Sequence, residues 1–183
     1  MKKVVALLMI LLSFAALTAC GKKDDSTSDG DNNDMTFKDV SMEDLKAAVV
    51  DVLGENYWPD MPVDAEMLSQ IYGVTSDMYE EYLAESPMIS ANVDTLIIIK
   101  AKEGKVSAVE EALGAYRDRM VNDTMQYPMN ISKIQSSRIE TFGNYVCFVQ
   151  LGAETPEDEE EAILHCQEEN EKAIDAIRNA LSK

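Results

Sequence analysis

The residue with the most specific chemical context in this chain is Cys20, whose thiol is a nucleophile that can be acylated. Before it, Lys2 and Lys3 form a positive segment, Val4 to Leu17 form an almost unbroken apolar run, and small residues follow. This order is typical of a secretory signal peptide. The apolar run is shorter than the roughly 20 residues that a membrane-spanning helix needs. We therefore predict that residues 1–19 are removed.

The segment Leu17-Thr18-Ala19-Cys20 resembles the lipobox of bacterial lipoproteins. The resemblance implies that Cys20 becomes the first residue of the mature chain and is diacylated on sulfur, with fatty acyl chains such as palmitate. Two acyl chains suffice for stable anchoring, so we expect a lipoprotein on the extracytoplasmic face of the cell membrane. The alternative is an ordinary secretion signal that is cut nearby and leaves Cys20 as a free thiol.

Residues 20–40 are predicted to form a disordered acidic tether. They are rich in Asp, Asn, Ser, Lys and Gly and have too few apolar side chains to form a core. A flexible segment of this length reaches about 25 Å, which would lift the following domain clear of the lipid headgroups. Residues 41–183 then form a single domain.

The other residue types that could do chemistry do not form a recognisable catalytic or metal site. The chain has one histidine, His165, which helical spacing points away from the apolar stripe, while its neighbour Cys166 points inward. A Cys-His dyad and a Ser-His-Asp triad are therefore not expected, and the sequence has neither a zinc-ligand cluster nor a glycine-rich phosphate loop. Paired carboxylates for glycoside hydrolysis are left open, because acidic residues are abundant. We predict no enzyme activity, no cofactor and no metal site.

The chain is strongly acidic, with 16 Lys and Arg residues against 34 Asp and Glu residues. Loss of Lys2 and Lys3 with the leader takes the formal net charge from −18 to −20. Because nucleic acids are bound through Lys and Arg, we exclude a nucleic-acid partner. Both Cys147 and Cys166 lie in apolar patterns, which favours two buried free thiols over the disulfide that a secreted protein could form.

Three helices are predicted in the first part of the domain. The first begins at Ser41 as N-cap and ends at Gly54, and the second runs from Asp64 to Gly73. A third is predicted over 77–85, where Met78, Tyr79, Tyr82 and Leu83 have helical spacing.

The second part is predicted to alternate strands and helices. A strand over 94–102 is apolar on both faces, and an amphipathic helix over 105–125 follows it. Strands over 134–141 and 145–151 form a hairpin, and a last helix opens at 155–158.

This order predicts an α+β fold with a three-stranded antiparallel sheet. The spatial order would be first, third, second strand, with the last two helices on one face. That is the ferredoxin-like βαββα arrangement with its last strand missing. The N-terminal helices would pack against the sheet and cover the other face of the first strand.

Six stretches of the sequence resemble the lipoproteins of Gram-positive bacteria grouped as domain of unknown function 4358. The resemblance covers about residues 41–152. The stretches are Tyr57-Trp58-Pro59 with Met61-Pro62, Pro87-Met88-Ile89-Ser90, Val93-Asp94-Thr95-Leu96-Ile97, Lys100-Ala101-Lys102-Glu103-Gly104, Tyr127-Pro128-Met129 and Gly143-Asn144-Tyr145-Val146. The resemblance implies a secreted, lipid-anchored α+β domain without an established role.

We predict a non-enzymatic module of the cell envelope that binds a ligand or a protein. Aromatic and Arg side chains carry most binding energy in interfaces, so the candidate binding residues are Tyr57, Trp58, Arg117, Tyr127 and Arg138. The aromatic pair could instead plug the edge of the core. The alternatives for function are a structural envelope protein that self-associates and a carboxylate-based hydrolase.

Overall fold

The computed structural model describes residues 37–89 and 91–182, so the predicted signal peptide, Cys20 and most of the predicted tether lie outside the described residues. The helices are α1 (Met42–Leu53), α2 (Ala65–Tyr72), α3 (Val106–Asn122), α4 (Pro128–Ser136) and α5 (Glu159–Ser182), with a 3-10 turn η1 (Gly54–Asn56) after α1. The strands are β1 (Met61–Pro62), β2 (Tyr79–Ser86), β3 (Thr95–Ala101), β4 (Arg138–Phe142) and β5 (Tyr145–Gln150).

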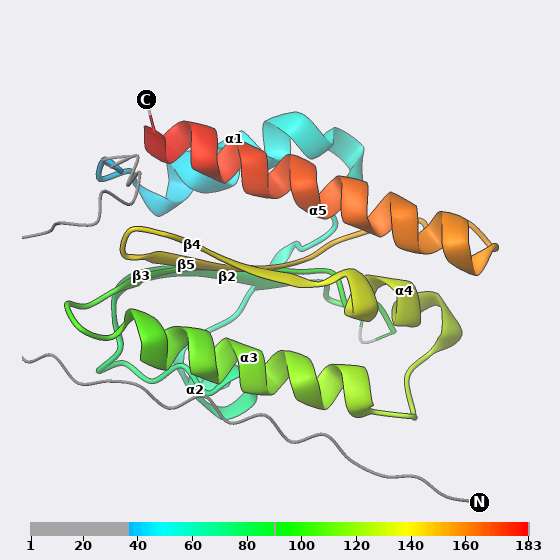
Figure 1. The fold of residues 1–183 in the computed structure, drawn as a ribbon, viewed down its shortest axis with the longest axis horizontal. Coiled ribbons are helices and arrows are strands. Elements are labelled where there is room, and N and C mark those ends of the chain that lie inside the picture. Colours follow the sequence, from blue (N-terminus) through cyan, green and yellow to red (C-terminus); the bar gives the residue numbers. More distant parts are fainter. Residues whose placement is uncertain (1–36, 90, 183) are drawn as a thin grey trace, which may run out of the picture. The chain divides into compact units, whose positions relative to one another are not determined.

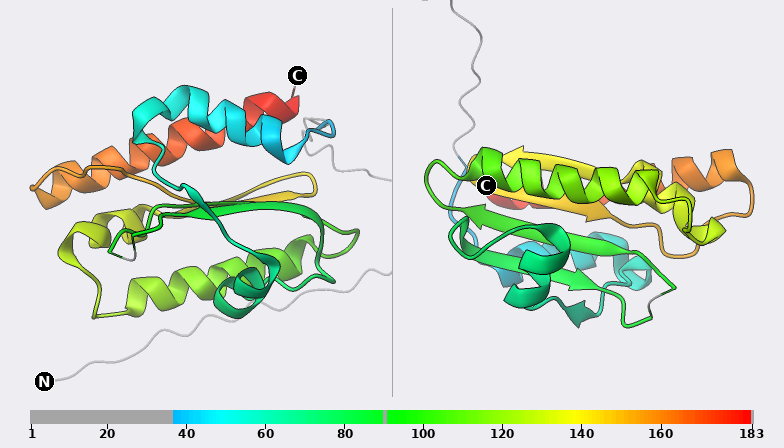
Figure 2. Two further views of the ribbon diagram at one scale, coloured as in Figure 1. Left: turned by 180° about the vertical axis from the view of Figure 1, so that it is seen from behind. Right: turned by 90° about the horizontal axis from the view of Figure 1, so that it is seen from below.

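The strands form one antiparallel sheet in the order β1-β2-β3-β5-β4. Helices α1 and α5 cover one face of this sheet, and α2 and α3 cover the other (Figures 1 and 2). The predicted α+β class and the predicted order of β3, β5 and β4 are confirmed.

The prediction of a three-stranded sheet is wrong, because β2 and β1 extend the sheet beyond β3. The ferredoxin-like placement of both later helices on one face is also wrong, since α3 and α5 lie on opposite faces (Figure 1). Strand β3 explains the difference. Leu96 and Ile98 point into the core beside α1 and α5, whereas Ile97 and Ile99 point into the core beside α2 and α3. Each face therefore needs its own helical cover, and the N-terminal helices divide between the two faces.

The helix predicted over 77–85 is also wrong, because this segment forms β2. A β-bulge lies between Tyr79 and Glu81, and it adds one residue to the strand. The bulge places Tyr79 and Tyr82 on the same face, with ring centroids 5.0 Å apart. A spacing of three residues on one face is typical of a helix, so the bulge produced a helix-like pattern within a strand.

The strand predicted over 134–141 begins too early. Residues up to Ser136 belong to α4, and β4 begins only at Arg138. Pro128 occupies the first turn of α4, where its missing N–H leaves no hydrogen bond unmade. This short helix, which was not predicted, carries Lys133 and packs against α5.

The predicted caps are confirmed for the first two helices. The Ser41 hydroxyl accepts a hydrogen bond from Asp44 N at 3.1 Å, and Asp64 Oδ1 accepts one from Met67 N at 2.8 Å. Gly73 ends α2 in the left-handed conformation at φ 76°.

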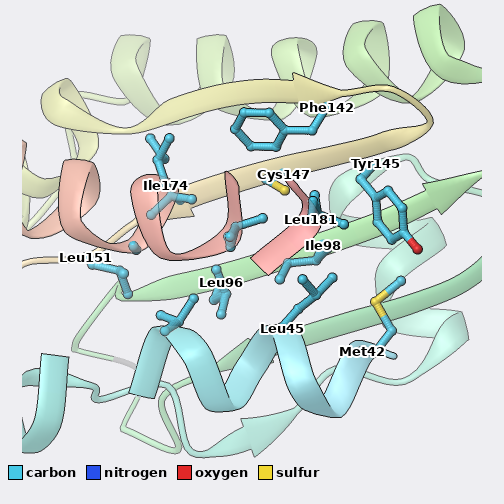
Figure 3. Close-up of a cluster of buried hydrophobic side chains, with 14 of the residues drawn as sticks. Met42, Leu45, Leu96, Ile98, Phe142, Tyr145, Cys147, Leu151, Ile174 and Leu181 are labelled. Atoms are coloured by element: carbon cyan, nitrogen blue, oxygen red, sulfur yellow. The ribbon is translucent and has the colours of Figure 1, made fainter. Parts of the chain in front are cut away.

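Two apolar cores lie on the two faces of the sheet. The core between the sheet and α1 and α5 is built from Leu45 of α1, Leu96 and Ile98 of β3, and Ile174 and Leu181 of α5, together with their neighbours (Figure 3). Cys147 belongs to this core, and both it and Cys166 are buried and unbridged, as predicted. The sheet is therefore a rigid base with packed layers on both sides.

Candidate functional site

A hollow lies at the end of the sheet where α4 packs, between the segment that follows η1, the segment that continues β2, and the start of α4. Its volume is about 570 Å³. We call it the Trp58 hollow, and its lining residues are Tyr57, Trp58, Asp60, Pro87, Met88, Ile89, Ala91, Asn92 and Met129.

Large apolar side chains around the Trp58 hollow are exposed to solvent. The exposed fraction is 70% for Met88, 69% for Ile89, 60% for Met129 and 37% for Trp58. Single exposed apolar residues are ordinary, but four that gather at one hollow are typical of an interaction site. Methionine and isoleucine contribute apolar area here, and methionine can also adapt its shape to a ligand.

A smaller and more polar pocket of about 300 Å³ adjoins the Trp58 hollow. We call it the Lys133 pocket, and its lining residues are Trp58, Asn92, Met129, Asn130, Lys133, Ala153, Glu154 and Thr155. Trp58, Asn92 and Met129 line both spaces, so one ligand could contact the two together.

The Lys133 pocket is built on a buried ion pair. Lys133 Nζ lies 2.6 Å from Asp94 Oδ1, and it also donates a hydrogen bond to Asn92 Oδ1 at 3.1 Å. The same ammonium lies 5.2 Å from the centroid of the Trp58 ring, within the range of a cation–π contact. Burial raises the pKa of the Asp94 carboxyl, and the Lys133 ammonium acts in the opposite direction. The ammonium is therefore fully engaged, and it supports one face of the indole.

Asn130 lines this pocket and has one unpaired, fully buried polar atom. Its side chain is buried, and its Nδ2 donates a hydrogen bond to Ala91 O at 2.9 Å. Its Oδ1 has no hydrogen-bond donor among residues 37–89 and 91–182. The same is true of Gln150 Oε1, but Gln150 lines neither the Trp58 hollow nor the Lys133 pocket. A buried acceptor without a donor lowers the stability of the folded state. The presence of Asn130 at this position therefore has a reason other than stability.

The predicted residues Tyr57 and Trp58 have different roles in the structure. The Tyr57 hydroxyl donates a hydrogen bond to Glu85 Oε2 at 2.5 Å, and Lys46 pairs with the other oxygen of the same buried carboxylate. Burial, and then the Glu85 carboxylate, raise the pKa of Tyr57. Tyr57 also packs against the core between the sheet and α1, so it anchors the segment that presents Trp58.

The structure does not bring the other predicted residues to this site. Arg117 and Arg138 line a separate cavity of about 520 Å³ beside α5. Arg117 Nε donates to Ser137 O at 2.9 Å, and Arg138 pairs with Glu140 and Glu171, so both guanidinium groups are engaged within the domain. Tyr127 is 57% exposed at the start of α4 and lines neither the Trp58 hollow nor the Lys133 pocket.

Sequence reasoning missed Met88, Ile89 and Met129 because methionine is usually core filler and exposure cannot be read from residue type. It missed Lys133 and Asn130 because the helix that carries them was not recognised. The available signal was the grouping of Pro87, Met88 and Ile89 with Trp58 in the stretches that carry the family resemblance.

His165 Nε2 lies 3.0 Å from Gly152 O, and burial raises the pKa of the Cys166 thiol to about 11, so this thiol is protonated at neutral pH. Within the described ranges, no group of three His, Cys, Asp or Glu side chains is placed to bind a metal ion. No helix among these residues is long and apolar enough to cross a membrane.

Comparison with known proteins identifies a family but no individual relative. No curated protein and no solved structure matches this chain. A family model described as a domain of unknown function (DUF4358) matches residues 53–151, more than half of the sequence, and this region includes both Trp58 and Lys133. The chain therefore belongs to the DUF4358 family.

Proposed function

We propose that this protein is a lipoprotein anchored through Cys20 to the extracytoplasmic face of the cell membrane, and that its domain is a non-enzymatic binding module of the envelope. The anchor is supported by the signal-peptide order of the leader and by the lipobox resemblance of Leu17-Thr18-Ala19-Cys20. Its ligand is an apolar segment of an envelope peptide or protein.

The Trp58 hollow is the observation that carries the binding function. Its volume lies in the range of ligand pockets, and its walls combine exposed apolar side chains with a few polar groups. Trp58 is supported on one face by Lys133, so its position is fixed before a ligand arrives. A fixed aromatic group loses little conformational freedom on binding, which favours affinity.

The position of the hollow suits a protein that is held by a tether. Figure 1 shows the start of α1 and helix α4 at opposite ends of the sheet. Helix α1 has 12 residues and is therefore about 18 Å long, and Trp58 follows its C-terminal end. The predicted tether therefore joins the domain before α1, at the end of the sheet opposite α4.

Binding can be tested on soluble residues 35–183, which form a compact unit. A panel of apolar and polar peptides is screened by thermal shift and by the fluorescence of Trp58, the single tryptophan of the chain. A ligand at a hundred times its Kd stabilises the fold by about 2.7 kcal/mol. We expect apolar peptides to raise Tm and polar peptides of equal length to have no effect.

Two exposed methionines provide a matched pair of variants. Met129 lines the Trp58 hollow, whereas Met125 is 86% exposed and does not line it. Met129→Lys should abolish the shift, and Met125→Lys should retain it. Equal loss in both variants, or a panel without any apolar hit, would refute the proposed site.

The proposed lipid anchor is tested on the full-length chain, which includes Cys20. In a Gram-positive host grown with labelled palmitate, the wild-type chain should carry label and sediment with membranes, and the Cys20→Ser variant should do neither. A wild-type chain that is secreted without label would refute the lipoprotein assignment.

Self-association is the second candidate, because the exposed residues Met88, Ile89 and Met129 could also contact another copy. Sedimentation velocity separates the two functions. A monomer whose sedimentation does not change with concentration supports the binding module, and a dimer that Met129→Lys dissociates supports self-association.

A further inference from the structure

Resting on the proposed binding function, we infer that the ligand of the α4 end is an apolar segment of a partner protein with Lys or Arg residues beside it. The apolar walls select the apolar part of this segment, and exposed acidic side chains at the same walls select its basic part. The evidence is the distribution of charge over three spaces that adjoin at Met129.

A third space lies beside the Trp58 hollow and the Lys133 pocket. Its volume is about 530 Å³, and we call it the α5 hollow because it is lined by the start of α4 and by the segment that leads into α5. Met129 lines all three spaces, and Thr155 lines both the Lys133 pocket and the α5 hollow, so one ligand can contact all three. The lining residues of the α5 hollow are Pro128, Met129, Ile131, Ser132, Thr155, Pro156, Glu157, Glu159 and Ala162.

Each of the three spaces has at least one exposed carboxylate in its lining. Asp60 lines the Trp58 hollow, and Glu154 lines the Lys133 pocket. Glu157 and Glu159 line the α5 hollow. None of these four carboxylates makes an ion pair with a basic side chain among residues 37–89 and 91–182. Their charge is therefore available to a ligand.

The lining residues of these spaces include no basic side chain that could balance the acids. Lys133 is the single Lys or Arg among them, and it is 3% exposed and held in the buried ion pair described above. The cavity beside α5 is different, because Arg117 and Arg138 line it together with Glu168 and Glu171. Acidic and basic side chains are equal in number there, so an excess of acid is not common to all the cavities of this acidic chain.

Local structure explains only some of the acids. Glu159 lies in the first turn of α5, where the helix dipole favours a negative charge. Asp60 accepts a hydrogen bond from Met88 N at 3.0 Å and so holds the wall of the Trp58 hollow. Glu154 and Glu157 lie outside the helices, and Asp158, not Glu157, accepts a hydrogen bond from an N–H of the first turn of α5. The fold gains no contact from these two side chains, which is expected if they contact a ligand.

This combination of walls and charges determines the chemical class of the ligand. Unpaired carboxylates at an apolar surface favour a partner that brings Lys or Arg together with apolar side chains. A metal ion alone is disfavoured, because no three His, Cys, Asp or Glu side chains in the described ranges converge to bind one. A phosphate or an anionic lipid headgroup would be repelled. A second copy of this chain would bring the same acidic walls, so the charges also disfavour self-association through this surface.

The test compares three capped peptides on residues 35–183. They share an apolar centre and differ only in their two flanking residues: acetyl-Lys-Gly-Leu-Ile-Leu-Gly-Lys-amide, the same peptide with Gln in place of Lys, and the same peptide with Glu. Binding is measured by Trp58 fluorescence and calorimetry. At about 0.01 M salt we expect the Lys peptide to bind about fivefold more tightly than the Gln peptide, and the Glu peptide to bind most weakly.

A salt series on the wild-type domain provides a second measurement. The screening length falls from about 30 Å at about 0.01 M salt to about 3 Å at about 1 M, so the difference between the Lys and Gln peptides should disappear at high salt. A difference that persists at high salt would show that the Lys side chains bind through their apolar stems, and it would overturn the charge selection.

The triple variant Glu154→Gln, Glu157→Gln and Glu159→Gln locates the charges that act. In this variant the Lys and Gln peptides should bind with similar affinity at low salt. The three side chains are exposed, and Gln keeps their size, so the variant is expected to fold. The salt series does not depend on this variant and keeps the inference testable without it.

The matched control is the variant Glu103→Gln, Glu111→Gln and Asp118→Asn. These three acids are also exposed, but they line none of the three spaces. The control loses the same net charge as the first variant and should retain the preference for the Lys peptide. An equal loss of preference in both variants would mean that the overall charge of the domain acts, and it would overturn selection by these walls.

The outcomes separate this inference from the proposed function. Equal affinity of the Lys and Gln peptides for the wild type at low salt, or tighter binding of the Glu peptide, would overturn the inference and leave an apolar binding site. The Gln peptide depends on the apolar walls alone, so its loss in Met129→Lys tests the proposed function by itself. If none of the three peptides binds, the inference is overturned, and the peptide panel described above decides the proposed function.

Discussion

The two ends of the domain distribute polar and apolar side chains in opposite ways. At the end where residues 37–41 pack, Phe37 lies against Phe142 at a centroid distance of 5.8 Å, and the ion pair between Lys100 and Asp39 lies at the surface. At the α4 end, an ion pair is buried and methionine is exposed. Lys133 and Asp94 are 3% and 0% exposed, whereas Met88 and Ile89 are largely in solvent.

The first arrangement is what folding alone favours, because it buries apolar area and leaves charges in water. The second costs stability twice, once for the desolvated charges and once for the exposed apolar area. An inversion of this kind is expected where a ligand, and not the fold, determines which side chains are present. The comparison can be tested by variants at matched positions of the two ends.

The largest effect is expected from breaking the buried pair. Lys133→Met leaves the Asp94 carboxylate buried without its partner, and we expect the free energy of unfolding to fall by about 3–5 kcal/mol. Lys100→Met breaks the surface pair with Asp39 and should produce a much smaller change. Urea unfolding followed by circular dichroism measures both. Similar losses in the two variants would remove the contrast between the ends.

The tyrosine hydroxyls form a second matched pair. Tyr57 donates to the buried Glu85 carboxylate, and Tyr145 donates to the exposed carboxylate of Asp39 at 2.8 Å. Tyr57→Phe should lower the free energy of unfolding by about 1.5–3 kcal/mol, because it removes a hydrogen bond to a buried charged group. Tyr145→Phe should have a smaller effect in the same denaturation experiment, and the reverse order would contradict the assignment of Tyr57 as an anchor.

Two glycines test how tightly the base of the α4 end is packed. A Cβ at Gly152 would lie 2.7 Å from Cys166 Sγ and 3.2 Å from Lys133 Cγ, whereas a Cβ at Gly114 in α3 would meet no atom within 4 Å. Gly152→Ala should therefore lower the free energy of unfolding by about 1–3 kcal/mol. Gly114→Ala should raise it by about 0.5–1 kcal/mol, because alanine favours a helix over glycine. Recovery of stability when Cys166→Ala is added to Gly152→Ala would confirm that the clash is the cause.

Sequence patterns predicted the elements whose signals are local. Helices α1 and α2 have their caps and apolar faces within one short segment, and β3 is recognisable because it is apolar on both faces. The patterns failed in two places. In β2, the bulge shifts the alternation of side chains by one residue and produces helical spacing. Helix α4 is too short to show a complete apolar stripe.

The candidate site could be predicted only in part, because its members meet through the tertiary fold. Trp58 is identifiable from residue type and from its place just before Pro59 and Pro62. Asp94 and Lys133 are 39 positions apart in the chain, and nothing local indicates that they pair. Met88 and Ile89 are exposed because no helix or strand packs over them in the folded domain. Their exposure therefore cannot be predicted from residue type.

The smallest effect concerns pH at the end where residues 37–41 pack. Hydrogen bonds from Lys100 and then from Tyr145 lower the pKa of Asp39 below its ordinary value of 3.8. An acid whose pKa is lower in the folded state stabilises the fold above its unfolded pKa, and this contribution disappears as the pH falls through the folded pKa. The difference in the free energy of unfolding between wild type and Asp39→Asn should thus be constant from pH 7 to pH 5 and shrink below about pH 3.8. Denaturation at a series of pH values measures it, and a difference that grew on acidification would mean that the lowered pKa of Asp39 does not reflect a stabilising contact.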